Sequence, residues 1–322
     1  MKEYILRKIS KKKAEKYTYI YLDKNGRNAN KSLVKKTLDG LYLPPAHDNV
    51  KISLNKSDKV LAIGYDVKGR AQYTYNKKFT EKTSKAKYKH MIEFGMSYKK
   101  IINQINKDLY TEGDSKNKQI AMILKLVIDC CFRIGNDKYA KENKSYGVST
   151  LLSDHVKVTS DNIKISFKGK KGVENTCNFK DKKLSREFKR KKRTLHKKDR
   201  IFTYRNDSCY CHVSSDDVNR YLKRFGNFST KNFRTWNANI EFITQIIKLE
   251  IGDSETTLKK SINDSIKMVA NKLHNTAAVC KSNYIDPVLL DRYMKNPRGF
   301  IKHFSECKTK VQLTDKYIEL LK

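Results

Sequence analysis

Apolar positions between residues 4 and 75 come in short runs separated by turn residues. Segments such as YTYIYLD, VKISL, KVLAIGYD and AQYTY are rich in aromatic and β-branched side chains, which pack well in strands. This stretch is therefore predicted to form a small, mainly β domain.

The pattern changes further along the chain to the longer period of amphipathic helices. Apolar residues recur at i, i+3 and i+4 through residues 91–109 and again through residues 118–132, KQIAMILKLVIDCCF. The change follows the polar run KKFTEKTSKAK, where we place a domain boundary. The predicted layout is a β-rich domain over residues 1–82 and a larger, mainly helical domain over residues 83–322.

One β island interrupts the helical part. Apolar residues alternate with polar ones in DHVKV and then at Ile163, Ile165 and Phe167, on the two sides of a Ser-Asp-Asn turn. The pattern predicts hairpin strands, followed by a tip with the sequence GKKG at residues 169–172. Two cations at such a tip can reach into a groove, but the tip lacks the spacing of a phosphate-binding P-loop.

Further helices are predicted toward the C-terminus. Ser229 and Thr230 supply an N-cap before KNFRTWNANIEFITQIIKLEIG, which places Arg234 in the first turn. The segment SINDSIKMVANKL is amphipathic as well, and it leads into a shorter helical piece that carries Tyr284 before Pro287. Tyr284 is therefore expected at the end of a helix or in the turn that follows it.

The charge of the chain indicates a class of partner. Its 322 residues include 70 lysines and arginines against 34 aspartates and glutamates, a formal charge of +36, which favours a polyanion and in the first place nucleic acid. No apolar run approaches the roughly 20 residues of a membrane-spanning helix, and the N-terminal MKEYILRKISKKKAEK lacks the apolar core of a secretory signal. We expect an intracellular protein with no membrane partner.

The seven cysteines lack the even number and regular spacing of a secreted disulfide framework, so we expect reduced thiols. The cluster Cys209-Tyr210-Cys211-His212 contains ligand types suited to zinc. Its spacing is wrong, however, and no second cluster completes a set of four ligands. We therefore expect no bound metal.

The chemistry can be narrowed by elimination. No carboxylates are spaced for two magnesium ions and no P-loop for ATP is present. What remains is attack on phosphorus by a side-chain hydroxyl, with protein cations that stabilise the charge of the phosphorane. Tyrosine suits the attack when neighbouring cations lower the pKa of its hydroxyl from about 10, and arginine's planar fork suits phosphate oxygens. A lysine then protonates the leaving oxygen.

Five blocks of residues resemble, in order and spacing, the poxvirus-like DNA topoisomerases of type IB, and the match spans most of the chain. The first block, DVKGRAQYTY at residues 66–75, is similar to the family's DxKGRxQYxY signature, which lies in a β-rich domain that clamps one side of duplex DNA. The resemblance implies that these residues contact DNA: Lys68, Arg70, Gln72, Tyr73 and Tyr75.

The next three blocks resemble catalytic motifs of the family. RIG followed by KYAKEN is similar to R-x-G-x-x-x-Y-x-K-E-N, which implies that Arg133 is the first catalytic arginine and that Tyr139 contacts DNA. The FKGK tip resembles the hairpin whose lysine is the general acid, so Lys170 takes that role, with Lys171 as its rival and as a DNA contact. FRTW matches the motif of the second catalytic arginine, Arg234.

The last block, LHNTAAVCKSNYIDP, resembles the bacterial L-G-N-T-P-A-x-C-R-x-S-Y-I-x-P, which ends in the nucleophile and assigns that role to Tyr284. Poxvirus members carry a histidine nine residues before the tyrosine, where this chain has Asn275. Bacterial members carry asparagine there, and an amide N–H also donates to phosphate, so we expect Asn275 to hold a nonbridging oxygen. His274 is the alternative. Ala277 replaces the usual proline, which leaves the local turn open.

The resemblance implies an α+β fold of the tyrosine recombinase and topoisomerase IB type, with a small β-rich domain and a larger, mainly helical catalytic domain that contains the β-hairpin island. It also implies a monomer that encircles double-stranded DNA and relaxes supercoils through a 3′-phosphotyrosyl link, without a cofactor or an obligate protein partner. Abundant Lys, Asn, Ile and Tyr are typical of an AT-rich genome. Together these point to a large DNA virus, and to the virion or the viral replication site in the host cytoplasm.

Two other classes stay open. A tyrosine recombinase uses a related set of residues but carries an H-x-x-R box, whereas Lys231 stands three residues before Arg234 in this chain. A non-catalytic DNA-packaging protein would explain the charge but not the spacing of the five blocks.

Overall fold

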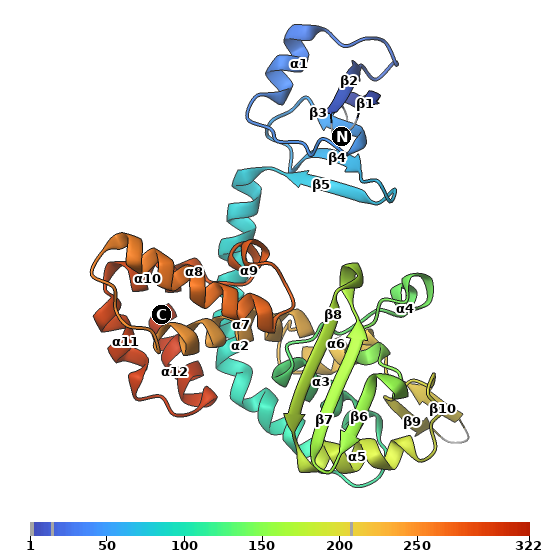
Figure 1. Cartoon of the computed structure of the whole chain (residues 1–322), viewed down its shortest axis with the longest axis vertical. Helices are drawn as coiled ribbons and strands as arrows, with labels where there is room; N and C mark the ends of the chain where they lie inside the picture. The colour runs from blue at the N-terminus through green and yellow to red at the C-terminus, as the bar shows by residue number, and fades with distance from the viewer. Residues whose placement is uncertain (1–2, 14–15, 207–208) are drawn as a thin grey trace. The chain divides into compact units, whose positions relative to one another are not determined.

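The structure is a computed structural model that describes residues 3–13, 16–206 and 209–322. The chain divides into two compact units, Met1–Lys89 and His90–Lys322 (Figure 1). Helix α2 (Lys77–Leu109) contributes its first turns to the first unit and the remainder to the second. The mixed α and β content agrees with the class expected from the sequence.

The first unit contains a five-stranded antiparallel sheet in the order β2-β1-β3-β4-β5. Alternate residues on its inner face, Ile5, Val50, Ile52 and Ala62, form the core. The strands are β1 (Tyr4–Lys13), β2 (Lys16–Leu22), β3 (Asp48–Ser53), β4 (Val60–Tyr65) and β5 (Ala71–Tyr75).

The first unit also contains a helix that the sequence pattern did not predict, α1 (Lys31–Leu38). The side chain of Asn30 caps it by accepting a hydrogen bond from the backbone N–H of Ser32 at 2.9 Å. A helix of eight residues spans little more than two turns, which is too short for a clear 3.6-residue period.

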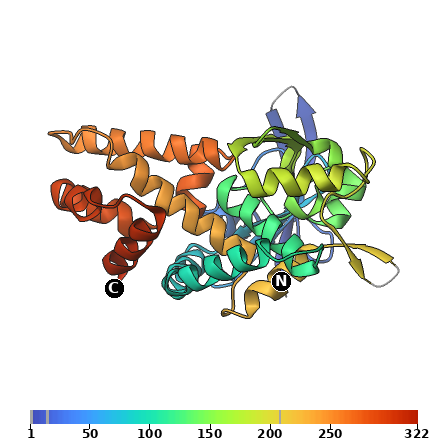
Figure 2. The same cartoon turned by 90° about the horizontal axis from the view of Figure 1, so that it is seen from below.

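Helix α7 (Thr230–Ile246) lies in the core of the second unit, with most of its residues buried. Figure 2 shows the helices from α7 onward, drawn from gold to red, gathered on the side away from the green strands. Between residues 3 and 322, outside the undescribed gaps, no helix is long and apolar enough to cross a membrane. The helices are α3 (Lys116–Asp129), α4 (Asp137–Asn143), α5 (Lys182–Lys192), α6 (Ser215–Lys223), α7 (Thr230–Ile246), α8 (Glu255–Lys272), α9 (Ala277–Asn283), α10 (Pro287–Lys295), α11 (Pro297–Ser305) and α12 (Lys310–Leu321).

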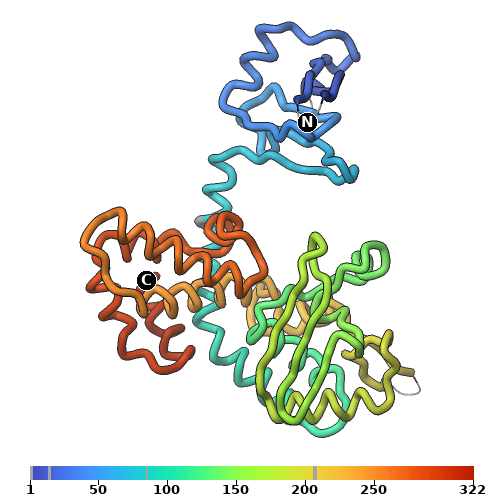
Figure 3. The backbone as a smooth tube through the Cα atoms, in the orientation of Figure 1, coloured from blue at the N-terminus to red at the C-terminus, as the bar shows by residue number. Residues whose placement is uncertain are grey.

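The predicted β island is present as an antiparallel sheet in the order β6-β7-β8, and its inner face is the expected one. Ile163, Ile165 and Phe167 are buried, while the residues between them face solvent. The tip between β7 and β8 forms a narrow projecting loop (Figure 3). The strands are β6 (Val156–Thr159), β7 (Asn162–Lys168) and β8 (Glu174–Lys180), and a separate hairpin contains β9 (Thr203–Asn206) and β10 (Cys209–His212).

Helix α3 ends at Asp129, earlier than the sequence pattern predicts. Cys130 caps the helix, and Cys131 then adopts a left-handed backbone conformation with a φ of 53°. This conformation turns the chain out of the helix before Phe132. The apolar residues continue past the turn because they are buried in the core, so their period did not reveal the end of the helix.

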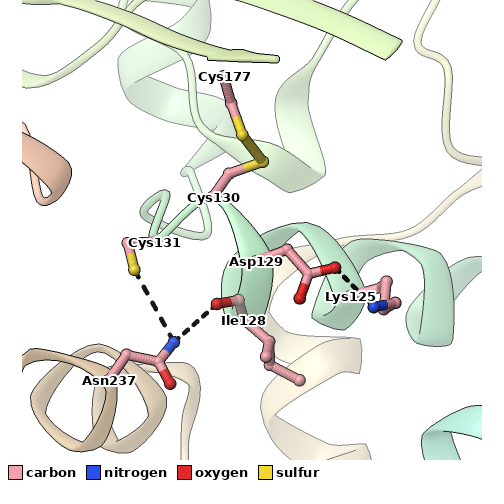
Figure 4. The surroundings of a disulfide bond; sticks show 7 residues. All are labelled: Lys125, Ile128, Asp129, Cys130, Cys131, Cys177 and Asn237. Atoms are coloured by element: carbon pink, nitrogen blue, oxygen red, sulfur yellow. Dashed lines mark hydrogen bonds and ion pairs between the residues drawn. A yellow bond between two sulfur atoms is a disulfide. The ribbon is translucent and has the colours of Figure 1, made fainter. Parts of the chain in front are cut away.

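The expectation that every cysteine is reduced is wrong for one pair. Cys130 and Cys177 form a disulfide, with their Cα atoms 5.7 Å apart (Figure 4). They lie 47 residues apart in the sequence and become neighbours only because β8 packs beside the end of α3. The cysteine count and spacing carry no signal of this proximity.

Candidate active site

The residue predicted as nucleophile, Tyr284, lies at the C-terminal cap of α9. Its backbone N–H donates to the carbonyl of Cys280 at 2.9 Å, and Thr276 caps the other end of the helix through Val279. Pro287 then begins α10. The short helix therefore ends at Asn283, where the sequence predicts, and the half-buried Tyr284 caps it.

Arg234 lies in the first turns of α7 with its side chain only 5% exposed. Two of its guanidinium nitrogens donate to the backbone carbonyls of Cys131 and Leu273. The third, Nε, lies 3.4 Å from the hydroxyl of Tyr284. The two carbonyls fix the planar group, so that its remaining edge faces the tyrosine.

Arg133 lies in the segment after α3, and its side chain extends toward Asn275 and the surroundings of Tyr284. Its Nη2 donates to Oδ1 of Asn275 at 2.9 Å. The backbone of Arg133 is held by a hydrogen bond from the N–H of Val148 at 2.9 Å. Gly135, with a φ of 101°, packs closely against Gly147. A Cβ added to Gly147 would lie 2.5 Å from Cα of Gly135 and 2.7 Å from the carbonyl oxygen of Arg133. The two glycines let these backbone segments approach each other.

The side chains of Asn275 and its neighbour His274 have different surroundings. The Nδ2 atom of Asn275 is buried and makes no hydrogen bond of good geometry among the described residues, but its amide lies close enough to the hydroxyl of Tyr284 to help lower the pKa of that tyrosine. The ring of His274 instead stacks on Phe132, with their centroids 5.8 Å apart. Burial lowers the pKa of His274, and the charges of Arg234 and Arg133 lower it further, which favours the neutral ring.

The charge around Tyr284 favours its ionised form. Burial alone would raise the pKa of the hydroxyl, but the charge of Arg234, the hydrogen bond from the same side chain and the charge of Arg133 together lower the pKa below its ordinary value. The guanidinium of Arg234 also lies 5.3 Å from the centre of the tyrosine ring. The site thus combines a hydroxyl that is easier to ionise with two fixed cations.

Lys170 lies apart from this cluster, at the exposed hairpin tip. Lys171 lies beside it in a left-handed conformation with a φ of 65°. Both lysines are exposed to solvent. The base of the hairpin is anchored, because the N–H of Tyr146 donates to the carbonyl of Lys168 at 2.9 Å.

The sequence analysis missed a buried side chain that supports the tyrosine. Asn239 donates to the carbonyl of Tyr284 at 3.0 Å and accepts from the N–H of Asp286 at 2.7 Å, so it holds the backbone on both sides of Ile285. Asp286 in turn accepts a hydrogen bond from the hydroxyl of Tyr317 at 3.0 Å. A polar residue on the buried stripe of α7 was the only signal of this role.

Comparisons with known proteins agree with this arrangement. The family model for the catalytic core of eukaryotic DNA topoisomerase I matches residues 76–311. The chain is 31% identical over 302 residues to DNA topoisomerase 1B of Acanthamoeba polyphaga mimivirus, covering 91% of this chain and 89% of that protein. It belongs to the DNA topoisomerase I family. This topoisomerase is also 26% identical over 243 residues to DNA topoisomerase 1B of vaccinia virus strain Copenhagen, with 72% of each chain covered.

The predicted DNA contacts in the first unit of the topoisomerase surround one turn between β4 and β5. Asp66 accepts hydrogen bonds from the side chains of Arg70, at 2.6 and 2.8 Å, and Gln72, at 3.0 Å, and from the backbone of Lys68. Tyr73 and Tyr75 are 53% and 44% exposed, and their rings stack with centroids 6.2 Å apart. The turn therefore has a fixed shape and an exposed aromatic face.

Tyr139, the remaining predicted contact, lies in the second unit at the start of α4. Asn136 caps this helix by accepting from the backbone N–H groups of Lys138 and Tyr139. The tyrosine side chain is exposed. Its aromatic ring is therefore available to a partner of the topoisomerase.

Proposed function

We propose that this chain is a type IB DNA topoisomerase, which relaxes supercoiled DNA by cutting and resealing one strand. The observation that carries the proposal is the position of the Tyr284 hydroxyl, 3.4 Å from Nε of a buried arginine, with its pKa lowered. The names of the mimivirus and vaccinia relatives, both DNA topoisomerase 1B, support the same activity.

In this mechanism the oxygen of Tyr284 attacks a backbone phosphorus of the duplex. A bond forms between the tyrosine oxygen and phosphorus, and the bond from phosphorus to the 5′ oxygen breaks. The cut strand then carries a 3′-phosphotyrosyl link and a free 5′-hydroxyl. After the duplex has rotated, the 5′-hydroxyl attacks the link and reseals the strand. The tyrosyl ester conserves the energy of the phosphodiester, so the reaction requires neither ATP nor a metal ion.

We assign stabilisation of the negative charge of the transition state to three side chains. Arg234 and Arg133 are the fixed cations, and fixed donors of this kind are the largest single contribution to many enzymatic rates. Asn275 has a buried Nδ2 that lies beside the hydroxyl of Tyr284 without a hydrogen bond of good geometry to any described residue, and we assign that donor to a nonbridging phosphate oxygen. His274 is the weaker candidate, because its ring is stacked on Phe132.

We assign protonation of the leaving 5′ oxygen to Lys170. Gly169 precedes it and is held by a hydrogen bond to the carbonyl of Val173 at 2.8 Å, so Lys170 projects from a fixed turn. Lys171 follows at the apex and is assigned a contact with the DNA backbone. Because Lys170 is exposed in the structure, we expect the bound duplex to bring the leaving oxygen to the hairpin tip.

The partner in this proposal is double-stranded DNA bound by a monomer. Phosphate contacts should come from Lys68 and Arg70 of the first unit, and aromatic contacts from Tyr73, Tyr75 and Tyr139. Binding to DNA should weaken steeply with salt, by about 0.9 log units of affinity per log unit of salt for each phosphate contact. The viral relatives support a site of action in the virion or at the viral replication site in the host cytoplasm.

The test is relaxation of a supercoiled plasmid in EDTA without ATP, with a denaturing gel to detect DNA joined to protein. The wild type should relax the plasmid and become linked to the 3′ end of the cut strand, whereas Tyr284→Phe should bind DNA and do neither. Tyr110→Phe is the matched control, because Tyr110 is exposed and lies outside the site. Binding without relaxation by the wild type would refute the proposal in favour of a recombinase or a packaging protein.

A further inference from the structure

The disulfide joins the two segments that carry proposed catalytic cations. Cys130 caps α3 and lies three residues before Arg133, and Cys177 lies on β8, seven residues after Lys170. A single covalent bond therefore links the backbone of the first arginine to the base of the hairpin that carries the lysine (Figure 4).

Non-covalent contacts also hold these two segments together. The ring of Phe132 packs edge-on against Phe167 of β7, with centroids 4.9 Å apart, and the N–H of Tyr146 donates to the carbonyl of Lys168. Cys177 pairs with Ile165 across the sheet and shares its inner face. Among these contacts the disulfide is the covalent one, and it leaves the tip exposed.

The fold selects this pair of cysteines from the seven. Cys131 is adjacent to Cys130, but its left-handed backbone turns its sulfur toward α7, where Nδ2 of Asn237 lies 3.9 Å away (Figure 4). The other free cysteines lie at residues 209, 211, 280 and 307. Cys130 is buried and Cys177 is partly exposed, so Cys177 is the cysteine of the pair nearer to solvent and the one that an attacking thiolate meets first.

We propose that Cys130 and Cys177 form a thiol–disulfide modification site that sets the rate of DNA cleavage. The reductant is a low-molecular-weight thiol such as glutathione. Its thiolate attacks Cys177, the bond between the two protein sulfurs breaks, and Cys130 leaves and takes up a proton. A second thiolate then attacks the mixed disulfide, which releases Cys177 as a thiol. Two molecules of the thiol are oxidised to one small disulfide, and the protein disulfide is reduced to two thiols.

Reduction releases the hairpin base from the Arg133 segment, and the catalytic cations are then less well fixed relative to each other. Displacement of a reacting group by about 1 Å can reduce a rate by about 100-fold, so a looser hairpin is expected to slow cleavage by about tenfold. Binding of uncut DNA should change little, because Lys171 is the one proposed DNA contact that lies on this hairpin. The inference rests on the catalytic roles proposed above for Arg133 and Lys170.

The experiment equilibrates the full-length protein with a series of ratios of oxidised to reduced glutathione. At each ratio, free thiols are alkylated and digests are examined by mass spectrometry for a peptide that joins Cys130 to Cys177. The single-turnover rate of cleavage of a duplex is measured on the same samples. Cys177→Ser removes the bond, and Cys209→Ser is the matched control, because Cys209 is exposed and unpaired.

The cleavage rate of the wild type should rise about tenfold as the linked peptide forms. Cys177→Ser should stay at the reduced rate at every ratio, and Cys209→Ser should follow the wild type. Absence of the linked peptide at all ratios would overturn the proposal. A cleavage rate that stays the same whether or not the linked peptide has formed would overturn it too. A protein that forms the linked peptide but cleaves in neither state would instead refute the catalytic roles, and with them the proposed redox regulation of cleavage.

Discussion

Replacement of Phe132 by leucine is expected to test how the active site is held together. The ring is buried between Phe167, whose centroid is 4.9 Å away, and His274, at 5.8 Å. Leucine keeps most of the apolar burial but loses both ring contacts. Aromatic pairs contribute about 0.5–1.5 kcal/mol each beyond their area, so Phe132→Leu should lower the free energy of unfolding by about 1–3 kcal/mol.

The same substitution is expected to slow catalysis at temperatures where the protein stays folded. Phe132 precedes Arg133 directly, packs on the strand that leads to Lys170 and stacks on the residue before Asn275. It therefore sets the spacing of three segments with proposed catalytic roles. Because small misplacements cost up to about 100-fold, single-turnover cleavage should fall by about 10- to 100-fold.

The assay compares Phe132→Leu with Phe188→Leu. Phe188 is also buried and packs edge-on against Phe202 at 6.1 Å, but it lies on α5, which carries none of the proposed catalytic residues. Thermal unfolding, binding of uncut duplex and cleavage are measured for both variants. The control should lose stability and cleave normally. If Phe132→Leu loses stability and also cleaves at the rate of the wild type, the ring does not position the catalytic groups.

Three further perturbations probe the same site. The cleavage rate should rise with pH, with an inflection below the ordinary tyrosine pKa of about 10 because the pKa of Tyr284 is lowered, and Arg133→Ala should move that inflection to higher pH. Tyr317→Phe removes a donor to the buried carboxylate of Asp286 and should lower the free energy of unfolding by about 1.5–3 kcal/mol, measured by denaturant titration. Gly147→Ala adds a Cβ against the backbone of Arg133 and should reduce cleavage more than DNA binding.

Each of these predictions has an outcome that contradicts it. An inflection that stays in place in Arg133→Ala would show that this cation does not favour the ionised tyrosine, and an unchanged unfolding midpoint in Tyr317→Phe would show that the hydrogen bond to Asp286 is dispensable. Gly113→Ala is the destabilised control for Gly147→Ala, because an added Cβ there meets open space but the φ of 74° strains any residue other than glycine. Equal loss of cleavage in both glycine variants would point to general destabilisation.

The sequence predicted the elements that depend on local pattern. The hairpin strands around Ile165, the cap at Ser229 and the position of Tyr284 at a helix end all follow from periodicity, capping residues and proline. The end of α3 was predicted too late, because the left-handed turn at Cys131 is imposed by packing. Helix α1 was missed because it is short.

What the sequence could not supply were pairings between distant residues. Nothing in the order of residues shows that Asn239 holds the backbone around Tyr284, or that Cys130 meets Cys177. Such contacts arise only when separate elements pack together. The role of Lys170 as general acid also remains a prediction, because the group that it would protonate is the leaving 5′ oxygen of DNA.

The anchoring of Arg234 has a consequence for the synthesis of the protein on the ribosome. Its guanidinium is held by the carbonyl of Cys131, 103 residues earlier, and by that of Leu273, 39 residues later. A nascent chain that has not yet emerged as far as Leu273 lacks one anchor as well as the nucleophile. Synthesis from the N-terminus therefore completes the DNA-cutting centre only near its end, and incomplete chains released early from the ribosome should be unable to nick DNA.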